Sequence, residues 1–264
     1  MAAQFDAMAE LTGTFKLLFE RRNWMLVIPP LIAAAVAGIL FAITMGIVWG
    51  SLMAGAGAAG MMGGGERGPG AMFGAIGFVG ILVVIIVALV ALAVFFFGHA
   101  WAYAAAEPVW RGGDPDLGGG FSKALAKFGS VLVLAVVLGI VLVLLGWTII
   151  VPLLVAFFCC YSVVYIIYGN QSGTGSISAS INLAKNNAGP TAILIVSLVV
   201  LAFVLGLISA IPFLGWIIGL VGNALLGAFA VLAVLRFYSL LTGAATATPV
   251  AAAPPPPPPT TPAT

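Results

Sequence analysis

Apolar runs long enough to span a membrane alternate with short polar stretches along this chain. Residues 29–50 and 76–103 each hold one run, and residues 130–168 and 191–238 each hold a run of about double length. A helix needs about 20 apolar residues to cross a bilayer, so each long run is divided at its central glycine-containing turn. The pattern predicts six spans at about 29–50, 76–103, 130–146, 150–168, 191–210 and 215–238.

The basic residues support this division independently. When successive polar segments are assigned alternately to two sides, Arg67 falls on one side and every other basic residue falls on the opposite side: Lys16, Arg21, Arg22, Arg111, Lys123, Lys127, Lys185 and Arg236. Cytoplasmic loops of membrane proteins carry an excess of Lys and Arg. The charge pattern therefore predicts a multi-pass protein of the cell (inner) membrane with cytoplasmic N- and C-termini. A five-span or seven-span division would scatter the same charges.

The composition changes the picture by excluding a soluble protein. Hydrophobic residues make up 63% of the chain and charged residues only 6%, whereas a soluble domain carries about 25% charged residues. The formal net charge of +2 is too small to suggest a nucleic-acid partner. We therefore expect the lipid bilayer to surround most of the chain.

A short polar stretch with apolar residues at helical spacing precedes the first, third and fifth spans. Residues 1–28 form the first such amphipathic, interfacial segment, "FSKALAKF" lies in the second and "GSISASINLAKNNAGP" is the third. The "ALAK" of the second is echoed by the "NLAK" of the third. The predicted fold is all-α, a polytopic transmembrane helical bundle of three amphipathic-helix-plus-hairpin units and an internal repeat. The third stretch is expected to form an interfacial helix over 176–186, and the alternative is a cytoplasmic substrate gate built on Asn182, Asn186 and Asn187.

Two segments are predicted to lie outside the membrane domain of residues 29–243. Residues 244–264 contain six consecutive prolines and are expected to form a disordered cytoplasmic tail, with a docking motif as the alternative. Residues 50–77 are rich in glycine and are expected to form a flexible extracytoplasmic loop. Their methionines offer an alternative, a Cu(I) site, because thioethers are soft ligands: Met53, Met61, Met62 and Met72.

Small residues recur at four-residue spacing in two spans. They are Ala34, Gly38, Ala42, Gly46 and Gly50 in the first, and Gly215, Gly219, Asn223 and Gly227 in the sixth. Such spacing lets helix backbones approach closely in lipid. We expect Asn223 to hydrogen-bond across to another helix, with a ligand contact as the alternative. The partners left open are the other ladder, a second copy in a homo-oligomer, or another membrane protein.

Residues suited to chemistry are scarce. His99, Tyr103 and Glu107 share one helical face near the end of the second span, as an aromatic belt at the interface or, alternatively, as a proton relay. Cys159 and Cys160 are adjacent and are expected to pack rather than to bridge. A single histidine without a ligand cluster gives no zinc site, and the glycine-rich stretch lacks the lysine of a phosphate loop. We expect no catalytic residue, cofactor or metal, and hence no enzyme.

Several phrases resemble a known family. "LLFERRNWMLVIPPL", "SINLAKNNAGP", "IPFLGW" and "RFYSLLTG" are similar to the membrane domain of glycerophosphoryl diester phosphodiesterase membrane-domain proteins and related six-span prokaryotic integral membrane proteins, over residues 11–243. The resemblance implies the six-span architecture and transfers no catalytic residue. A phosphodiesterase would need a separate barrel of about 250 residues, for which this chain has no room.

Two functions remain after these exclusions. The first is a non-catalytic integral membrane protein with a structural, assembly or regulatory role toward partners. The alternative is a transporter or permease for a small or lipidic substrate, which internal repeats favour and the scarcity of polar residues within the spans disfavours. A continuous polar cavity would favour transport, and a filled core would favour the first function.

Overall fold

Over the residues that the computed structural model describes, all regular secondary structure is helical. Those residues are 6–20, 22–61, 69–148, 150–211 and 214–243. Six helical segments are long and apolar enough to cross a membrane: Asn23–Gly50, Leu82–Trp110, Phe128–Leu145, Ile150–Ile167, Ala188–Ser209 and Ile218–Thr242. The predicted all-α, six-span fold is confirmed, and the chain is a multi-pass membrane protein.

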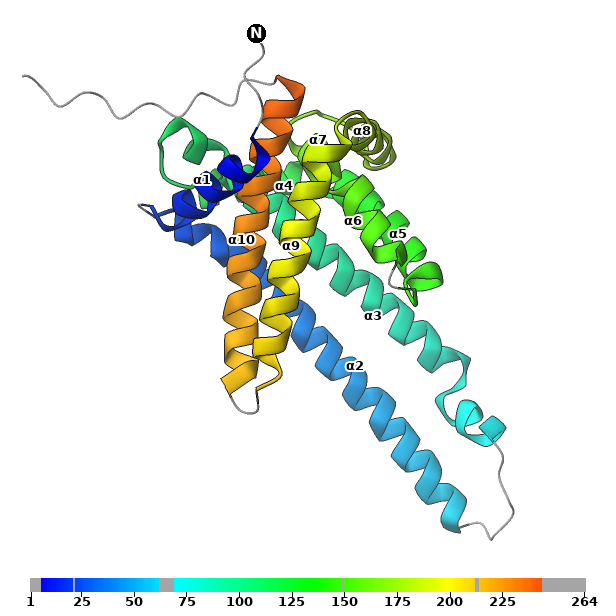
Figure 1. The fold of residues 1–264 in the computed structure, drawn as a ribbon. Helices are drawn as coiled ribbons and strands as arrows, with labels where there is room; N and C mark the ends of the chain where they lie inside the picture. Colours follow the sequence, from blue (N-terminus) through cyan, green and yellow to red (C-terminus); the bar gives the residue numbers. More distant parts are fainter. Residues whose placement is uncertain (1–5, 21, 62–68, 149, 212–213, 244–264) are drawn as a thin grey trace, which may run out of the picture.

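The first unit joins a short helix to the longest hairpin (Figure 1). It contains α1 (Ala7–Phe19), the 3-10 turn η1 (Asn23–Val27), α2 (Ile28–Met61) and α3 (Pro69–Ala105). The Asp6 carboxylate begins α1 by accepting hydrogen bonds from two backbone N–H groups, as an N-cap does.

The α2–α3 hairpin is longer than the sequence predicted. Residues 50–61 and 69–77 are helical, so the loop expected over 50–77 is wrong for both stretches. In lipid an unpaired backbone group is costly, and a run of glycine and alanine therefore does not by itself end a helix. Met62 and the proline-rich tail predicted over 244–264 lie outside the described residues.

The second unit has a break in its fourth span. The turn η2 (Glu107–Arg111) leads to α4 (Leu117–Ala126) and α5 (Phe128–Leu145), and the return span consists of α6 (Ile150–Cys159) followed by α7 (Ser162–Ile167). The sequence predicted one continuous span here. At the break, the Ser180 hydroxyl accepts the Tyr161 N–H at 3.1 Å and donates to the Phe158 carbonyl at 2.7 Å. A side chain of the next unit thus replaces the missing helical bonds.

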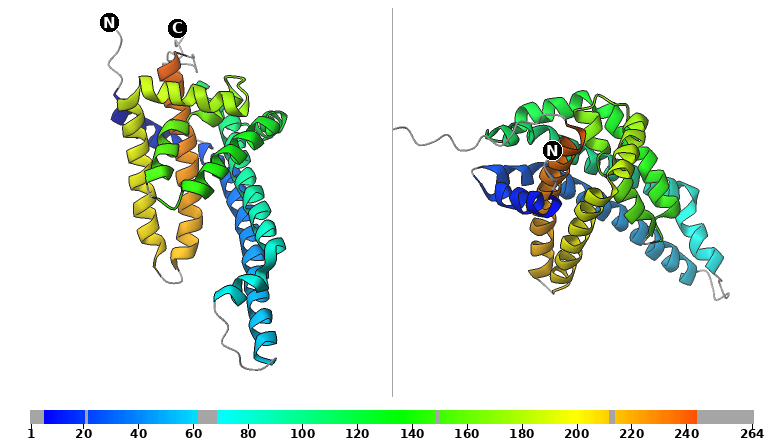
Figure 2. Two further views of the ribbon diagram at one scale, coloured as in Figure 1. Left: turned by 90° about the vertical axis from the view of Figure 1, so that its right-hand side faces the viewer. Right: turned by 45° about the horizontal axis from the view of Figure 1, so that its top comes forward.

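The third unit contains α8 (Gly173–Asn186), α9 (Ala188–Ser209) and α10 (Leu214–Thr242). Asn187 leaves the helical conformation, with φ −130° and ψ 46°, and separates α8 from α9. Figure 2 shows α8 lying across the ends of the long helices. The separate helix predicted over 176–186 is confirmed, and the buried Ser176 and Ser180 lie on its inner face.

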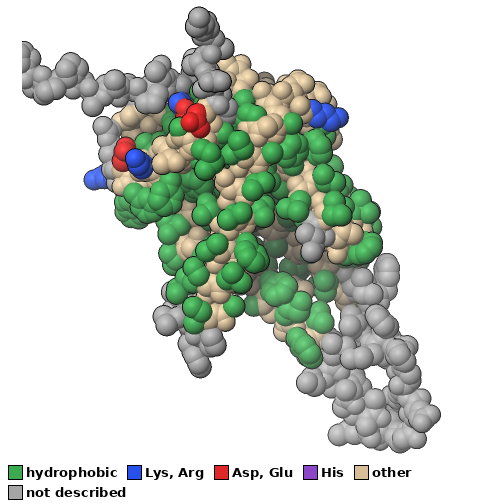
Figure 3. Space-filling model, viewed as in Figure 1, with side chains coloured by type: hydrophobic (Ala, Val, Ile, Leu, Met, Phe, Trp, Pro, Cys, Tyr) green, Lys and Arg blue, Asp and Glu red, His purple; other side chains and the backbone are tan. Residues whose placement is uncertain are grey.

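The short helices α1, α4 and α8 gather at one end of the bundle, which we call the capped end (Figures 1 and 2). The opposite ends of α2, α9 and α10 lie at what we call the open end (Figure 1). Every charged residue that the structure describes lies in or beside one of the helices at the capped end, and Figure 3 shows charged side chains gathered there. The one-sided distribution of basic residues inferred from the sequence therefore holds for those described.

The buried core lies at the capped end as well. Leu26, Leu134, Val164, Leu194 and Leu232 are all 0% exposed and belong to one apolar cluster drawn from all three units. Toward the open end, the α2–α3 hairpin diverges from α9 and α10 (Figure 1).

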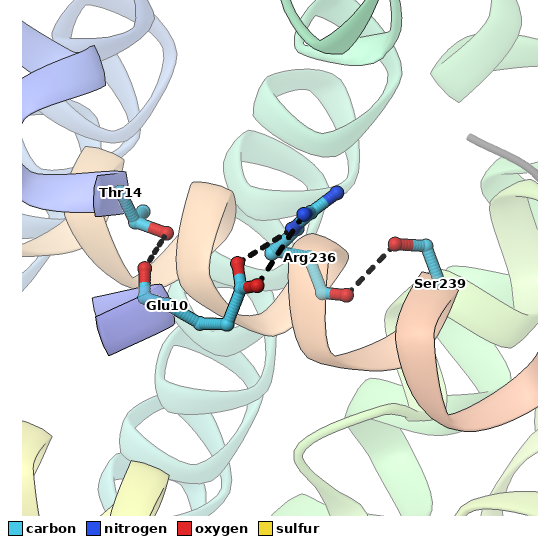
Figure 4. A network of polar contacts seen from close by, with 4 residues as sticks. All are labelled: Glu10, Thr14, Arg236 and Ser239. Carbon is cyan, nitrogen blue, oxygen red and sulfur yellow. Dashed lines mark hydrogen bonds and ion pairs between the residues drawn. The ribbon is translucent and has the colours of Figure 1, made fainter. Parts of the chain in front are cut away.

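Polar contacts fasten the short helices to the spans. Arg236 Nε of α10 donates to Glu10 Oε2 of α1 at 2.8 Å (Figure 4), and the guanidinium lies 5.1 Å from the centre of the Trp110 ring. Lys123 Nζ of α4 lies 2.8 Å from Glu107 Oε2 of η2. These pairs cross between elements, so they fix where α1 and α4 lie on the bundle.

Candidate functional site

A cavity of about 380 Å³ lies where the α2–α3 hairpin diverges from α9 and α10. We call it the wedge cavity, and its walls come from α2, α3, α6, α9 and α10. Its lining includes Pro30, Phe95, His99, Val199, Ala202 and Asn223. Figure 3 shows the surface hollowed between the helices of this region.

His99 brings an imidazole to the cavity wall. Its Nδ1 lies 3.0 Å from the Phe95 carbonyl one turn earlier in α3. A carbonyl oxygen only accepts, so Nδ1 carries the proton, and Nε2 of the neutral ring is an acceptor. Nε2 lies 4.0 Å from the position that a Cβ atom would take at Gly227 of α10. Among the described residues it has no hydrogen-bond partner.

Asn223 brings an amide from the opposite wall. Its Nδ2 donates to the Gly219 carbonyl of its own helix at 2.7 Å, so the predicted bond to another helix is wrong within this chain. The physical reason is the divergence of the hairpins, which leaves the cavity rather than a helix in front of this side chain. Its Oδ1 accepts no hydrogen bond from any described residue.

The rest of the lining is apolar. Of the described residues that line the cavity, only His99 and Asn223 carry polar side-chain atoms. On the capped-end side, the next residues along α9 and α10 include Leu194 and Leu232, both 0% exposed. The cavity therefore meets a filled apolar core and does not continue there as a polar path.

The small residues of the sixth span pack within the chain. A Cβ atom at Gly219 would lie 2.7 Å from Ser209 Oγ of α9, and one at Gly215 would meet the Ser209 backbone. A Cβ atom added at Gly227 would lie 3.3 Å from the Pro30 Cβ of α2. This ladder lets α10 approach its neighbours closely.

The small residues of the first span behave differently. A Cβ atom added at Gly38, Gly46 or Gly50 would have no neighbouring atom within 4 Å. Ala42, between them, is exposed. Ala34, at the start of this ladder, lines the wedge cavity. The two helices that carry these ladders, α2 and α10, approach each other at Pro30 and Gly227 and then part, because their hairpins diverge (Figure 1).

His99, Tyr103 and Glu107 are not brought together. Tyr103 is 5% exposed, and its carbonyl accepts the Tyr168 hydroxyl of the following unit at 2.6 Å, so the interfacial-belt interpretation is wrong for Tyr103. The helix ends at Ala105, which places Glu107 in η2 beside Lys123. Only His99 faces the cavity.

Three further close contacts involve glycines that the sequence analysis did not single out. A Cβ atom at Gly98 would lie 2.3 Å from the Ala33 Cβ, one at Gly120 2.6 Å from the Ala105 nitrogen, and one at Gly173 2.5 Å from the Ser130 carbonyl oxygen. Gly98 precedes Ala102 and Gly120 precedes Ala124 by four residues, and Gly173 follows Gly169, but none of them belongs to a ladder as long as those of the first and sixth spans.

No family model matches the chain, and neither a curated protein nor a solved structure matches it. The resemblance to the six-span phosphodiesterase membrane domain therefore stays a hypothesis.

Proposed function

We propose that this protein is a non-catalytic membrane scaffold that assembles with a partner membrane helix, from a second copy or from another protein, through the exposed small-residue face of α2. We define this α2 face as Gly38, Ala42, Gly46 and Gly50. The observation that carries the proposal is that these residues are spaced for close packing, yet no neighbouring atom lies within 4 Å of a Cβ atom at any of the three glycines. In lipid, small residues are where helices approach each other.

The capped end supports the same function. Its buried cluster and interlocking polar contacts hold three hairpins at one end, so α2 projects from a fixed base. The concentration of charge at this end favours a cytoplasmic location for it, with the α2 face within the bilayer.

A transporter for a small or lipidic substrate is the second candidate. The wedge cavity is the observation in its favour. Transporter sites usually combine broken helices with several polar groups. Here Ser180 satisfies the break in the fourth span, and the cavity meets an apolar core, so the scaffold is the better-supported function.

Substituting one exposed glycine tests assembly with a matched control. Gly46→Leu adds a bulky side chain to the α2 face, and Gly206→Leu adds the same side chain to α9, where a Cβ atom also has nothing within 4 Å. We expect Gly46→Leu to lower the fraction of assembled protein several-fold, measured by mass photometry of native nanodiscs, and Gly206→Leu to leave it unchanged. Equal assembly in both variants would contradict the proposal.

A further inference from the structure

We propose that the wedge cavity binds an uncharged amphiphile, a single-chain lipid whose head carries two hydroxyl groups, one donating a hydrogen bond to His99 Nε2 and the other donating one to Asn223 Oδ1. The two polar groups of this site belong to α3 and α10 and not to the α2 face, so the proposal does not rest on assembly through that face.

The lining excludes a charged head group. Every charged residue that the structure describes lies at the capped end, and the cavity wall contains none. A carboxylate or phosphate entering this site would lose its hydration without gaining a countercharge, which is costly in an apolar environment. The occupant's polar group is therefore neutral.

The two polar side chains select a donor. The Phe95 carbonyl fixes the His99 proton on Nδ1 and leaves Nε2 as an acceptor. The Gly219 carbonyl accepts from Asn223 Nδ2, and the Oδ1 of this lining side chain accepts from no described residue. Two acceptors are matched by two hydroxyl groups, each of which donates one hydrogen bond, and not by ethers, which only accept.

The two groups are placed for one small head group. Nε2 of His99 faces Gly227, and Asn223 lies one helical turn from Gly227 along α10, a rise of about 6 Å. The cavity volume of about 380 Å³ is within the range of about 300–1,000 Å³ that small-ligand sites occupy.

The apolar chain has a route from the bilayer. Phe95 of α3 is 45% exposed and Val199 of α9 is 40% exposed, and both line the cavity. The opening thus lies between two membrane spans, where a lipid chain enters sideways without crossing water.

The chain's single histidine provides a direct probe. The full-length protein is labelled with ¹⁵N-histidine, placed in phosphatidylcholine nanodiscs and titrated with a long-chain 1,2-diol, its dimethyl ether and the fatty acid of equal length. We expect the diol to shift the Nε2 resonance saturably. The ether should bind at least about tenfold more weakly, since a tenfold change corresponds to about one net hydrogen bond, and the fatty acid anion more weakly still.

Two variants test the geometry. Asn223→Leu should weaken diol binding several-fold and leave ether binding unchanged, and Ala202→Phe, at an exposed lining position, should block the binding of both. The wild-type titration decides the proposal even if a variant folds poorly. Equal shifts with diol and ether, stronger binding of the anion, or no shift because lipid chains or a partner helix fill the cavity would each overturn it. None of these outcomes alters the assembly result for Gly46→Leu.

Discussion

The capped end and the open end are built from the same apolar helices but are held together very differently. Half of an 18-residue apolar stretch of the sixth span is buried, whereas only 11% of such a stretch is buried in each of the first two spans. The fully buried residues of the sixth span lie from Ala228 to Phe237, toward the capped end. Lipid tails are as apolar as leucine, so apolar side chains alone give spans no reason to associate. The difference indicates that cohesion here comes from short helices, close glycine contacts and polar pairs at one end.

The largest expected difference in unfolding free energy is between leucine substitutions at a packed glycine and at an exposed glycine. Gly98→Leu forces a side chain into the Ala33 Cβ, which lies 2.3 Å from where the new Cβ would be, and should cost about 3 kcal/mol of unfolding free energy. Gly46→Leu should leave that free energy near wild type, because its site is open. Unfolding in mixed micelles measures both free energies. Similar losses in the two variants would show that the two regions are packed alike.

The Arg236–Glu10 pair should give the next largest effect. Arg236→Met strands the Glu10 carboxylate and removes the cation over Trp110, which should lower the unfolding free energy by about 2–3 kcal/mol. The control Lys185→Met changes an exposed cation on α8 and should have little effect. If the two variants lost equal stability, the pair would not fasten α1 to the bundle.

The break in the fourth span offers a smaller effect. Ser180→Ala leaves the Tyr161 N–H and the Phe158 carbonyl without their hydroxyl partner, at a cost of about 1–2 kcal/mol. Ser178→Ala on the exposed side of the same helix should be neutral. Hydrogen exchange of the Tyr161 amide should accelerate in the first variant alone, and unchanged exchange would count against this role of α8.

The six spans and the separate helix before the fifth span could be predicted from the sequence. Span length, the alternation of basic segments along the chain and helical spacing can all be read from the sequence itself. The break at Cys160 and Tyr161 was not predictable, since its hydrogen-bonding partner Ser180 lies in another unit. The small-residue ladder of α2 was visible in the sequence, but its exposure was not. Exposure depends on the divergence of whole hairpins.

The candidate site was visible only in part for the same reason. His99 and Asn223 stood out as rare polar residues within spans, yet the sequence grouped His99 with Tyr103 and Glu107. His99 and Asn223 share a cavity because α3 and α10 diverge on the open-end side of Gly227 (Figure 1). This divergence is a property of tertiary packing.

The smallest expected effect concerns Asn223. Its amide bonds only to Gly219 of its own helix among the described residues, so Asn223→Leu should change the unfolding free energy by less than about 0.5 kcal/mol. Thermal unfolding followed by circular dichroism measures this. A loss of several kcal/mol would instead favour the cross-helix bond predicted from the sequence and would place this side chain in a closed interface.

Footprinting with a phospholipid that carries a diazirine on its acyl chain tests the contrast between the two ends most directly. In nanodiscs, we expect the carbene to label Phe95 and Val199, which line the wedge cavity and are exposed, and to leave Leu194 and Leu232 unlabelled, since both are 0% exposed. Peptide mass spectrometry locates the label. Protection of Phe95 and Val199 equal to that of Leu194 and Leu232 would contradict the account, because it would mean that the hairpins close into one bundle along their whole length.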